Sequence, residues 1–160
     1  MTSSPSPSPS PSPSPNAPDH PALHQRVLAS FVRQGMMAQL GARLVRVAPG
    51  LCEIALPYSD KVSQQQGGFH GGAMGALADV AGGYAALTVV PAGMEVTTVE
   101  YKINFLQARQ GGSLLATGRV VRGGKRIIVT TAEIVHVAAD GSRCDCAVMQ
   151  QTLVPVAMTY

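Results

Sequence analysis

Residues 64–90 read QQQGGFHGGAMGALADVAGGYAALTVV, and this stretch governs how the rest of the chain is interpreted. From Gly71 to Val90 the only charged residue is Asp79, and most other positions are Ala, Gly, Leu or Val. A run this apolar predicts a buried element, and its Ala and Leu content favours a helix over a strand. A helix of about twenty residues rises roughly 30 Å, which is enough to cross a small domain. A membrane span is the competing interpretation, but the central acid, the glycines and the lack of basic flanks argue against it.

Gly75, Gly82 and Gly83 lie inside the predicted helix, where each glycine costs about 1 kcal/mol relative to alanine. We expect the close approach of another backbone, such as a sheet wrapped around the helix, to offset this cost. Asp79 lies four residues after Gly75 and four before Gly83, so it projects near the same side of the helix. A carboxylate in such surroundings is paired, hydrogen-bonded or catalytic. Spacing alone leaves open whether Asp79 is catalytic or a structural residue that bonds neighbouring backbone groups.

The predicted helix begins at His70-Gly71-Gly72, where backbone amides stand unobstructed. The unpaired N–H groups and the dipole of a helix N-terminus favour negative charge, so this start suits a developing oxyanion. Gly71 and Asp79 are eight residues apart, which separates them by about 12 Å along one straight helix. A base or nucleophile must come within about 3 Å of its reacting atom. If both groups are catalytic, two copies of the helix run antiparallel and the minimum assembly is a homodimer.

The same stretch carries a spaced set of polar residues and glycines. Gln64 is followed six positions later by His70-Gly71-Gly72, and Asp79 comes nine positions after the histidine. In this pattern the chain resembles the hotdog-fold acyl-CoA thioesterases, specifically the phenylacetate-degradation (PaaI-like) branch. Segments 97–106 and 147–153 are also similar to that branch, and the resemblance extends over residues 20–155. Members of the branch often have Asn where Gln64 stands. The Gln64 amide can make the same hydrogen bonds, but its longer side chain changes how it reaches the substrate or water.

The resemblance implies a hotdog fold and hydrolysis of a thioester. It implies that Asp79 of one subunit acts as the nucleophile or as a general base on water, and it does not decide between them. The amide of Gly71 or Gly72 in the other subunit would polarise the thioester oxygen. Gln64 would orient the water or the acyl carbonyl. His70, directly before the helix, is expected to cap or orient the helix, with a general-base role as the alternative.

Thr97 and Thr98 lie on the predicted strand after the helix and point to opposite faces, so only one of them can reach the site. Alignment with the family's hydroxyl position favours Thr98. The alternative is that either threonine has no role in the site and is present because β-branched residues favour strands. We expect the acyl group to lie against Met74, Leu77 or Tyr84, or against loop residues.

A cluster of cations, Arg122, Lys125 and Arg126, surrounds the pair Gly123-Gly124. Together with the resemblance, this cluster predicts that Arg122, Gly124, Lys125 and Arg126 hold the phosphates of coenzyme A. A solvated hairpin tip is the alternative interpretation.

The remaining sequence predicts one α+β domain. The alternation of Ser and Pro over residues 3–15 indicates a disordered tail spanning residues 1–19, with no secretory signal, before a domain of residues 20–157. In addition to the central helix, apolar spacing predicts a helix over 21–35 and a hairpin of strands 40–47 and 51–56. It also predicts four later strands, over 95–106, 113–122, 126–138 and 143–154. The short glycine-containing links at 110–112, 123–124 and 140–141 favour antiparallel neighbours. We therefore expect a curved antiparallel sheet around one long helix.

Composition narrows the class of function. A net charge of +3 with only 4% aromatic residues argues against nucleic-acid binding. Cys52, Cys144 and Cys146 form no Cys-x-x-Cys pair, so no metal site is predicted, and free thiols fit a reducing cytoplasm. Cys144 and Cys146 are expected to share a strand face without bonding each other.

We therefore expect a cytoplasmic hydrolase of an aryl- or medium-chain acyl-CoA that works as a dimer or, from the family, a tetramer. It would use no cofactor, because coenzyme A is part of the substrate. The alternative from another class is a non-catalytic hotdog domain that binds acyl-CoA or a related ligand. A hotdog dehydratase fits less well, because such enzymes usually place a His near the acid and none follows Asp79 before His136.

Overall fold

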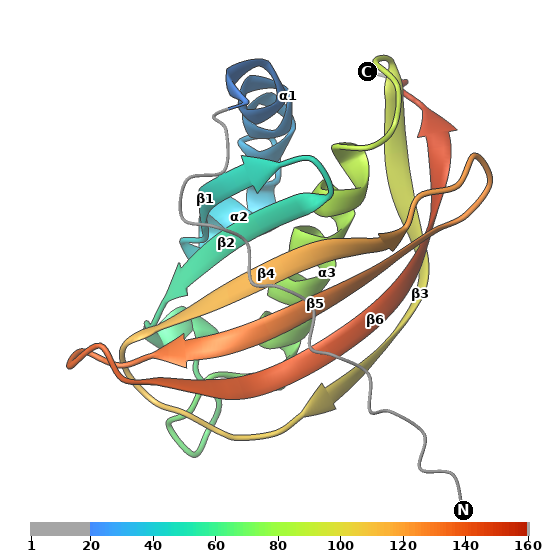
Figure 1. The fold of residues 1–160 in the computed structure, drawn as a ribbon. Helices are drawn as coiled ribbons and strands as arrows, with labels where there is room; N and C mark the ends of the chain where they lie inside the picture. Colours follow the sequence, from blue (N-terminus) through green and yellow to red (C-terminus); the bar gives the residue numbers. More distant parts are fainter. Residues whose placement is uncertain (1–19, 160) are drawn as a thin grey trace, which may run out of the picture.

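The structure is a computed structural model that describes residues 20–159 of the chain. Along the described chain, two short helices are followed by a hairpin, one long helix and four further strands (Figure 1). The elements are α1 (Pro21–Phe31), α2 (Gly35–Leu40), β1 (Arg43–Ala48), β2 (Leu51–Pro57), the 3₁₀ helix η1 (Asp60–Val62), α3 (Gly71–Leu87), β3 (Met94–Phe105), β4 (Ser113–Arg122), β5 (Ile128–Val137) and β6 (Arg143–Ala157). The predicted disordered tail, residues 1–19, lies outside the described residues.

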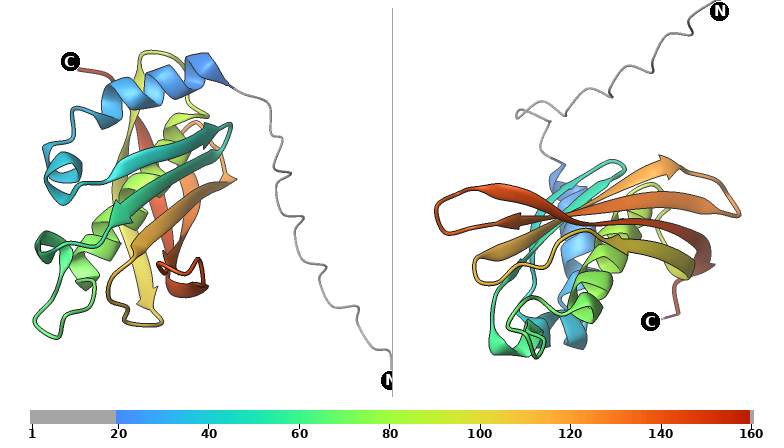
Figure 2. Two further views of the ribbon diagram at one scale, coloured as in Figure 1. Left: turned by 90° about the vertical axis from the view of Figure 1, so that its left-hand side faces the viewer. Right: turned by 90° about the horizontal axis from the view of Figure 1, so that it is seen from below.

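The strands form a single antiparallel sheet in the order β1-β2-β4-β5-β6-β3. The sheet curves around α3, and α1 packs next to β1 (Figures 1 and 2). This arrangement confirms the predicted α+β class and the hotdog fold. No helix in the described part of the chain has the length and apolar character that a membrane span requires.

Small residues let α3 and the sheet approach each other closely. Leu77, Ala78 and Ala81 of α3 are fully buried against the sheet. On β4, a Cβ atom at Gly118 would lie 2.2 Å from the carbonyl oxygen of Ala81, so only glycine fits there. The sheet therefore contributes a glycine of its own to the contact with the helix.

Among the three helix glycines of the predicted smooth side, only Gly82 is required by a close neighbour. A Cβ at Gly82 would lie 2.2 Å from Oε1 of Gln151, whereas Cβ atoms at Gly75 and Gly83 would lie 3.8 and 4.0 Å from their nearest neighbours. The space at Gly82 is therefore taken by the Gln151 and Thr130 side chains and not by the expected backbone, and alanine would fit the described chain at Gly75 and Gly83.

The N-terminal part differs from the prediction in one element. The helix predicted over 21–35 ends at Phe31, and Gly35 begins the separate helix α2. This second helix buries Met37 and ends at Gly41, whose φ of +80° is the left-handed conformation that favours glycine at a helix end. The strand expected from residue 40 therefore begins at Arg43.

The link between β3 and β4 does not join neighbours, which contradicts the prediction for the turn at 110–112. β3 lies at the sheet edge beside β6, while β4 lies between β2 and β5. Contacts with β6 and with the loop before α3 hold this crossing segment: Leu106 N–H donates to Cys146 O (2.8 Å), and Phe69 N–H donates to Arg109 O (2.8 Å). The links at 123–124 and 140–141 do join antiparallel neighbours, as predicted.

Candidate active site

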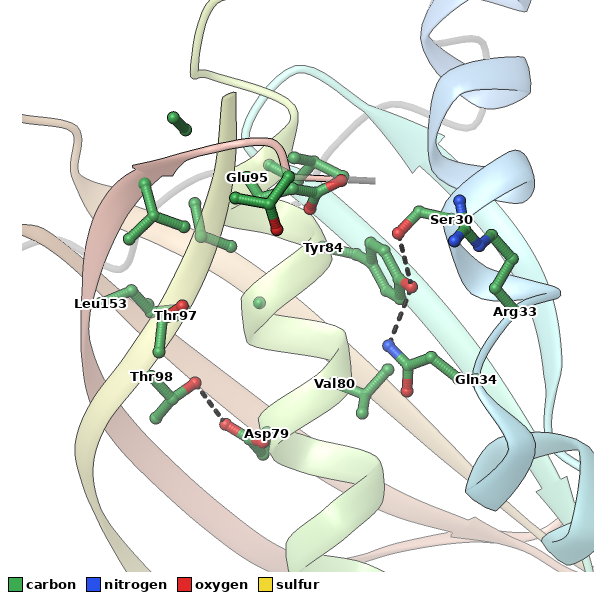
Figure 3. Close-up of a pocket in the computed structure, with 16 residues that line it drawn as sticks. Ser30, Arg33, Gln34, Asp79, Val80, Tyr84, Glu95, Thr97, Thr98 and Leu153 are labelled. Atoms are coloured by element: carbon green, nitrogen blue, oxygen red, sulfur yellow. Dashed lines mark hydrogen bonds between the residues drawn. The ribbon is translucent and has the colours of Figure 1, made fainter. Parts of the chain in front are cut away.

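Asp79 lies in the middle of α3, half-buried, with its carboxylate turned toward β3 and β6. The hydroxyl of Thr98 on β3 donates to Oδ1 of Asp79 at 2.7 Å (Figure 3). The side-chain amide of Gln151 on β6 donates to the same Oδ1 at 3.1 Å and to the Asp79 carbonyl oxygen at 3.2 Å. One carboxylate oxygen thus accepts two hydrogen bonds from two neighbouring strands.

Of the two candidate threonines, Thr98 is the one that contacts the carboxylate. Its neighbour Thr97 is exposed, although both side chains line the cavity beside Asp79. A register shift in the pairing of β3 with β6 follows Thr98, between Thr98 and Glu100. This irregularity lies next to the hydroxyl that bonds Asp79, as is common for bulges near functional sites.

The cavity beside Asp79 has a volume of about 540 Å³. It lies between α3, the C-terminal part of α1 with the residues that follow it, and the ends of β3 and β6 (Figure 3). One wall is a hydrogen-bonded chain in which Gln34 Nε2 donates to the Tyr84 hydroxyl (2.8 Å), which in turn donates to Ser30 Oγ (3.2 Å). Of the residues expected against an acyl group, only Tyr84 lines this cavity, because Met74 and Leu77 point into the core between α3 and the sheet.

At the start of α3, one of the two amides proposed from the sequence is already hydrogen-bonded and the other is not. His70 is the N-cap residue, and its Nδ1 accepts a hydrogen bond from Gly72 N–H at 2.8 Å. Gly71 N–H has no hydrogen-bond acceptor among residues 20–159. The ring of Phe105 lies over this position, since a Cβ at Gly71 would be 3.2 Å from its Cζ atom. Of the two amides proposed from the sequence, the amide of Gly71 is therefore the one that a ligand can occupy.

Gln64 lies in the loop before α3, at the same end of the helix as Gly71. Its Oε1 accepts a hydrogen bond from Gln66 N–H at 2.6 Å, so the side chain folds back on its own loop. The loop is held in turn by Gln64 N–H, which donates to Gly68 O at 2.9 Å. The chain therefore brings Gln64 close to the helix start and not to Asp79.

The helix between Gly71 and Asp79 is unbroken. Eight residues of continuous α-helix separate the two groups by about 12 Å along the axis. Within one chain the candidate residues therefore fall into two separate groups, one at the helix start with Gly71, His70 and Gln64, and one in mid-helix with Asp79 and Thr98.

The basic hairpin between β4 and β5 lies near the C-terminal end of α3. A Cβ at Gly123 would lie 3.7 Å from a methyl group of Val89, which comes two residues after α3 ends. Its three basic residues are Arg122, Lys125 and Arg126. Together with Gly124 and Ile127, they line an open cavity of about 560 Å³. In one chain this cluster is at the opposite end of α3 from Gly71.

Gln151 is the residue that sequence reasoning missed. Met149, Gln151 and Leu153 alternate on the buried face of β6, and Gln151 is a fully buried polar residue between two apolar ones. A glutamine on the apolar phase of an alternating strand is a usable signal, because a buried amide needs partners.

Comparisons with known proteins agree with the fold described above. A family model described as the thioesterase superfamily matches residues 66–138. A protein of Saccharolobus solfataricus, named provisionally as an esterase, is 36% identical over 102 residues, which cover 64% of this chain and 71% of that protein. A Listeria monocytogenes protein named 1,4-dihydroxy-2-naphthoyl-CoA hydrolase is 28% identical over 120 residues, which cover 73% of this chain and 98% of that protein.

Among solved structures, a thioesterase family protein from Silicibacter pomeroyi has a TM-score of 0.82 and 36% sequence identity. The match covers 85% of this chain and 99% of the Silicibacter chain. Fold, sequence and family model agree, and the chain belongs to the thioesterase superfamily.

Proposed function

We propose that this protein is an acyl-CoA thioesterase of the PaaI-like branch, which hydrolyses an aryl- or medium-chain acyl-CoA to the free acid and coenzyme A. The observation that carries the proposal is the Asp79 carboxylate, held at the wall of a 540 Å³ cavity by Thr98 and Gln151. The spacing of Gln64, His70, Gly71 and Asp79 supports the branch. The reaction needs water as its only co-reactant, and we place the enzyme in the cytoplasm.

The chemistry combines a polarising amide with an activated oxygen nucleophile. Gly71 N–H donates to the thioester oxygen and stabilises the oxyanion that forms when the carbonyl is attacked. Asp79 either attacks the carbonyl itself, giving an anhydride that water then opens, or removes a proton from the attacking water. In both routes the C–S bond breaks, coenzyme A leaves as a thiolate that takes up a proton, and water supplies the new carboxyl oxygen.

We propose that two subunits share each site, because about 12 Å of continuous helix separates Gly71 from Asp79 in one chain. The free edge of β3 supports this assembly. Along it, Val99, Tyr101 and Phe105 are 60%, 47% and 52% exposed, and Phe105 lies over Gly71. A long edge strand with exposed apolar side chains is suited to pairing with another chain. A second copy of β3 would bring two α3 helices antiparallel across the edge, and a tetramer would combine two such dimers.

We assign the parts of the substrate to two regions of the surface. The acyl group would occupy the cavity beside Asp79, whose polar wall of Gln34, Tyr84 and Ser30 suits a ring with polar substituents. The name of the Listeria relative, an aryl-CoA hydrolase, supports an aryl group. The phosphates of coenzyme A would lie against Arg122, Lys125 and Arg126, since guanidinium and ammonium groups bind phosphate strongly.

The proposal is tested with the purified protein and a panel of aryl- and medium-chain acyl-CoAs. Release of free thiol is measured with a chromogenic disulfide, and binding of each acyl-CoA is measured in parallel. We expect turnover of at least one aryl or medium-chain substrate well above the uncatalysed rate. Binding across the panel without thiol release would replace the enzyme with an acyl-CoA-binding domain.

Replacing the acid tests its role directly. We expect Asp79→Asn to lower kcat by about 100-fold or more, because the amide can neither attack the thioester nor accept a proton from water. Asn keeps an oxygen that can accept from Thr98, so thermal stability serves as the control for folding. Turnover close to that of the wild type would make Asp79 a structural residue.

A further inference from the structure

We infer that Gln151 is a positioning residue that holds the Asp79 carboxylate by Oδ1 and so leaves Oδ2 as the reactive oxygen. The inference deepens the proposed function and rests on it for its kinetic consequence. Gln151 is fully buried on β6, and its side-chain nitrogen lies 3.1 Å from Asp79 Oδ1, 3.2 Å from Asp79 O and 3.4 Å from Thr98 Oγ1.

The orientation of the Gln151 amide follows from the chemistry of its neighbours. A carboxylate oxygen and a backbone carbonyl can only accept hydrogen bonds, so the NH₂ end must face Asp79. The flipped amide would place its oxygen against both of these oxygens. The donor end of Gln151 is therefore fixed at Asp79, and the Thr98 hydroxyl completes a pair of donors on Oδ1.

The two oxygens of Asp79 consequently differ. Oδ1 accepts from Thr98 and Gln151, whereas Oδ2 accepts no hydrogen bond from residues 20–159. Fixing one oxygen sets the direction of the other, and a carboxylate held in this way loses little freedom when it meets the substrate. The nucleophile route and the general-base route both use Oδ2.

The surroundings of Gln151 indicate that stability alone does not account for it. Its Oε1 is buried without a hydrogen-bond partner in the described part of the chain, and so is the hydroxyl of Thr130 on β5. Both atoms crowd Gly82, where a Cβ would lie 2.2 Å from Gln151 Oε1 and 2.8 Å from Thr130 Oγ1. A buried unpaired oxygen and a mid-helix glycine both destabilise the fold. An apolar side chain at position 151 would avoid these costs but could not donate to Asp79.

The test compares Gln151→Met with Thr130→Val. Met is close to Gln in length and shape but has no donor, and the Thr130 hydroxyl makes no hydrogen bond to Asp79. For Gln151→Met we expect kcat to fall about 10- to 100-fold, the effect of losing a hydrogen bond to a charged group. We expect KM to change less than threefold and Tm to stay equal or rise. Thr130→Val should keep kcat within twofold of the wild type.

Gln151→Glu supplies a pH signature that a packing role would not give. When ionised, the introduced carboxylate would face the Asp79 carboxylate without a donor, whereas one shared proton restores an O–H donor toward Asp79. The kcat of this variant relative to the wild type should therefore rise as the pH is lowered. A flat ratio across the pH range, or a kcat for Gln151→Met within twofold of the wild type, would overturn the positioning role.

A structural measurement separates this inference from the proposed function. Crystal structures of the wild type and of Gln151→Met report the direction and the order of the Asp79 carboxylate. Without the Gln151 donor, the carboxylate should turn or become disordered, because only Thr98 still holds its Oδ1. If the wild type hydrolyses no thioester but the carboxylate moves in the variant, the proposed function fails and the contact stands. An unmoved carboxylate would remove the positioning role of Gln151 whatever the protein hydrolyses.

Discussion

His70 and the two glycines after it show how one side chain selects between two equivalent amides. By accepting from Gly72 N–H at 2.8 Å, His70 Nδ1 satisfies one unpaired donor of the helix start and leaves that of Gly71. A helix N-terminus has several such donors, and a ligand can use only those that the protein has not already paired. Of the two amides proposed for the substrate oxygen, the cap therefore leaves only that of Gly71, beneath the ring of Phe105.

Cys52 illustrates how burial acts on a residue outside the site. It is fully buried in β2, and burial, with a smaller contribution from the neighbouring Glu53 carboxylate, raises its pKa from 9.0 to about 12. In the unfolded chain the thiol ionises near pH 9. Above that pH the folded state retains a proton that the unfolded state loses, so ionisation favours unfolding.

We therefore expect the free energy of unfolding to fall more steeply for the wild type than for Cys52→Ala between pH 9 and pH 11. The excess slope is at most about 1.4 kcal/mol per pH unit. Urea unfolding under reducing conditions at a series of pH values measures it, and the comparison of slopes removes the constant cost of the cavity. Parallel curves for the two proteins would show that Cys52 does not carry the effect.

At the scale of elements, the contact of β4 with α3 leaves no space for a side chain at Gly118. Its Cβ would meet the backbone of Ala81 and Gly82, which cannot move away as a side chain can. We expect Gly118→Ala to lower the free energy of unfolding by at least about 2 kcal/mol. Gly83→Ala is the matched control, because its Cβ has room and gains up to about 1 kcal/mol of helix propensity. Equal effects of the two substitutions in thermal melts would contradict the packing described for α3.

The basic hairpin between β4 and β5 carries a prediction about the substrate's distal end. Alanine at Arg122 and Arg126 should raise KM for an acyl-CoA about 10-fold or more, because charge-assisted contacts to phosphate are lost. Neither residue contacts Asp79, so kcat should stay near the wild-type value. The same acyl group on pantetheine, which lacks the phosphates of coenzyme A, is the control and should show no change in KM. A matching loss on both substrates would make the hairpin a structural element.

Periodicity and spacing predicted most elements and made Asp79 and Gly71 site candidates, because these features are local in sequence, whereas the family resemblance favoured Thr98. The order of the strands was not predictable in the same way. The turn at 110–112 resembles a hairpin link, yet its segment is held by Phe69 and Cys146, which are distant in sequence. Gln151 was missed for a similar reason, since its partner Asp79 is 72 residues away. The helix over Gly35–Leu40 was missed because six residues that start with a glycine carry little periodic signal.

At the scale of the whole molecule, the shared site predicts complementation between two inactive variants. Gly71→Pro removes the proposed oxyanion donor, while proline is tolerated in the first helical position and His70 already has the extended ψ of 134° that precedes proline. Mixing Asp79→Asn chains with Gly71→Pro chains should give heterodimers with one intact site. With random exchange, about a quarter of the wild-type activity should return. The measurement is thiol release before and after subunit exchange.

Thr98 provides the matched control for this experiment. Because Thr98 bonds Asp79 of its own chain at 2.7 Å, a mixture of Asp79→Asn with Thr98→Val chains leaves every site with one defect. That mixture should show no recovery beyond the activity of the two variants alone. Equal behaviour of the two mixtures after demonstrated exchange would place the whole site within one subunit.

The crossing of β3 to the far edge of the sheet also affects how the chain acquires its shape during synthesis. β3 leaves the ribosome before β4 and β5, yet its sole neighbour in the described sheet is β6, the last of the six strands to be made. Until then β3 has no strand to pair with in its own chain, and Thr98 has no fixed position from which to reach Asp79. Translation must therefore reach the end of β6 before the Thr98 hydroxyl, the Gln151 amide and the Asp79 carboxylate can meet. A nascent chain that stalls earlier would expose β3 as an unpaired strand and would lack the assembled site.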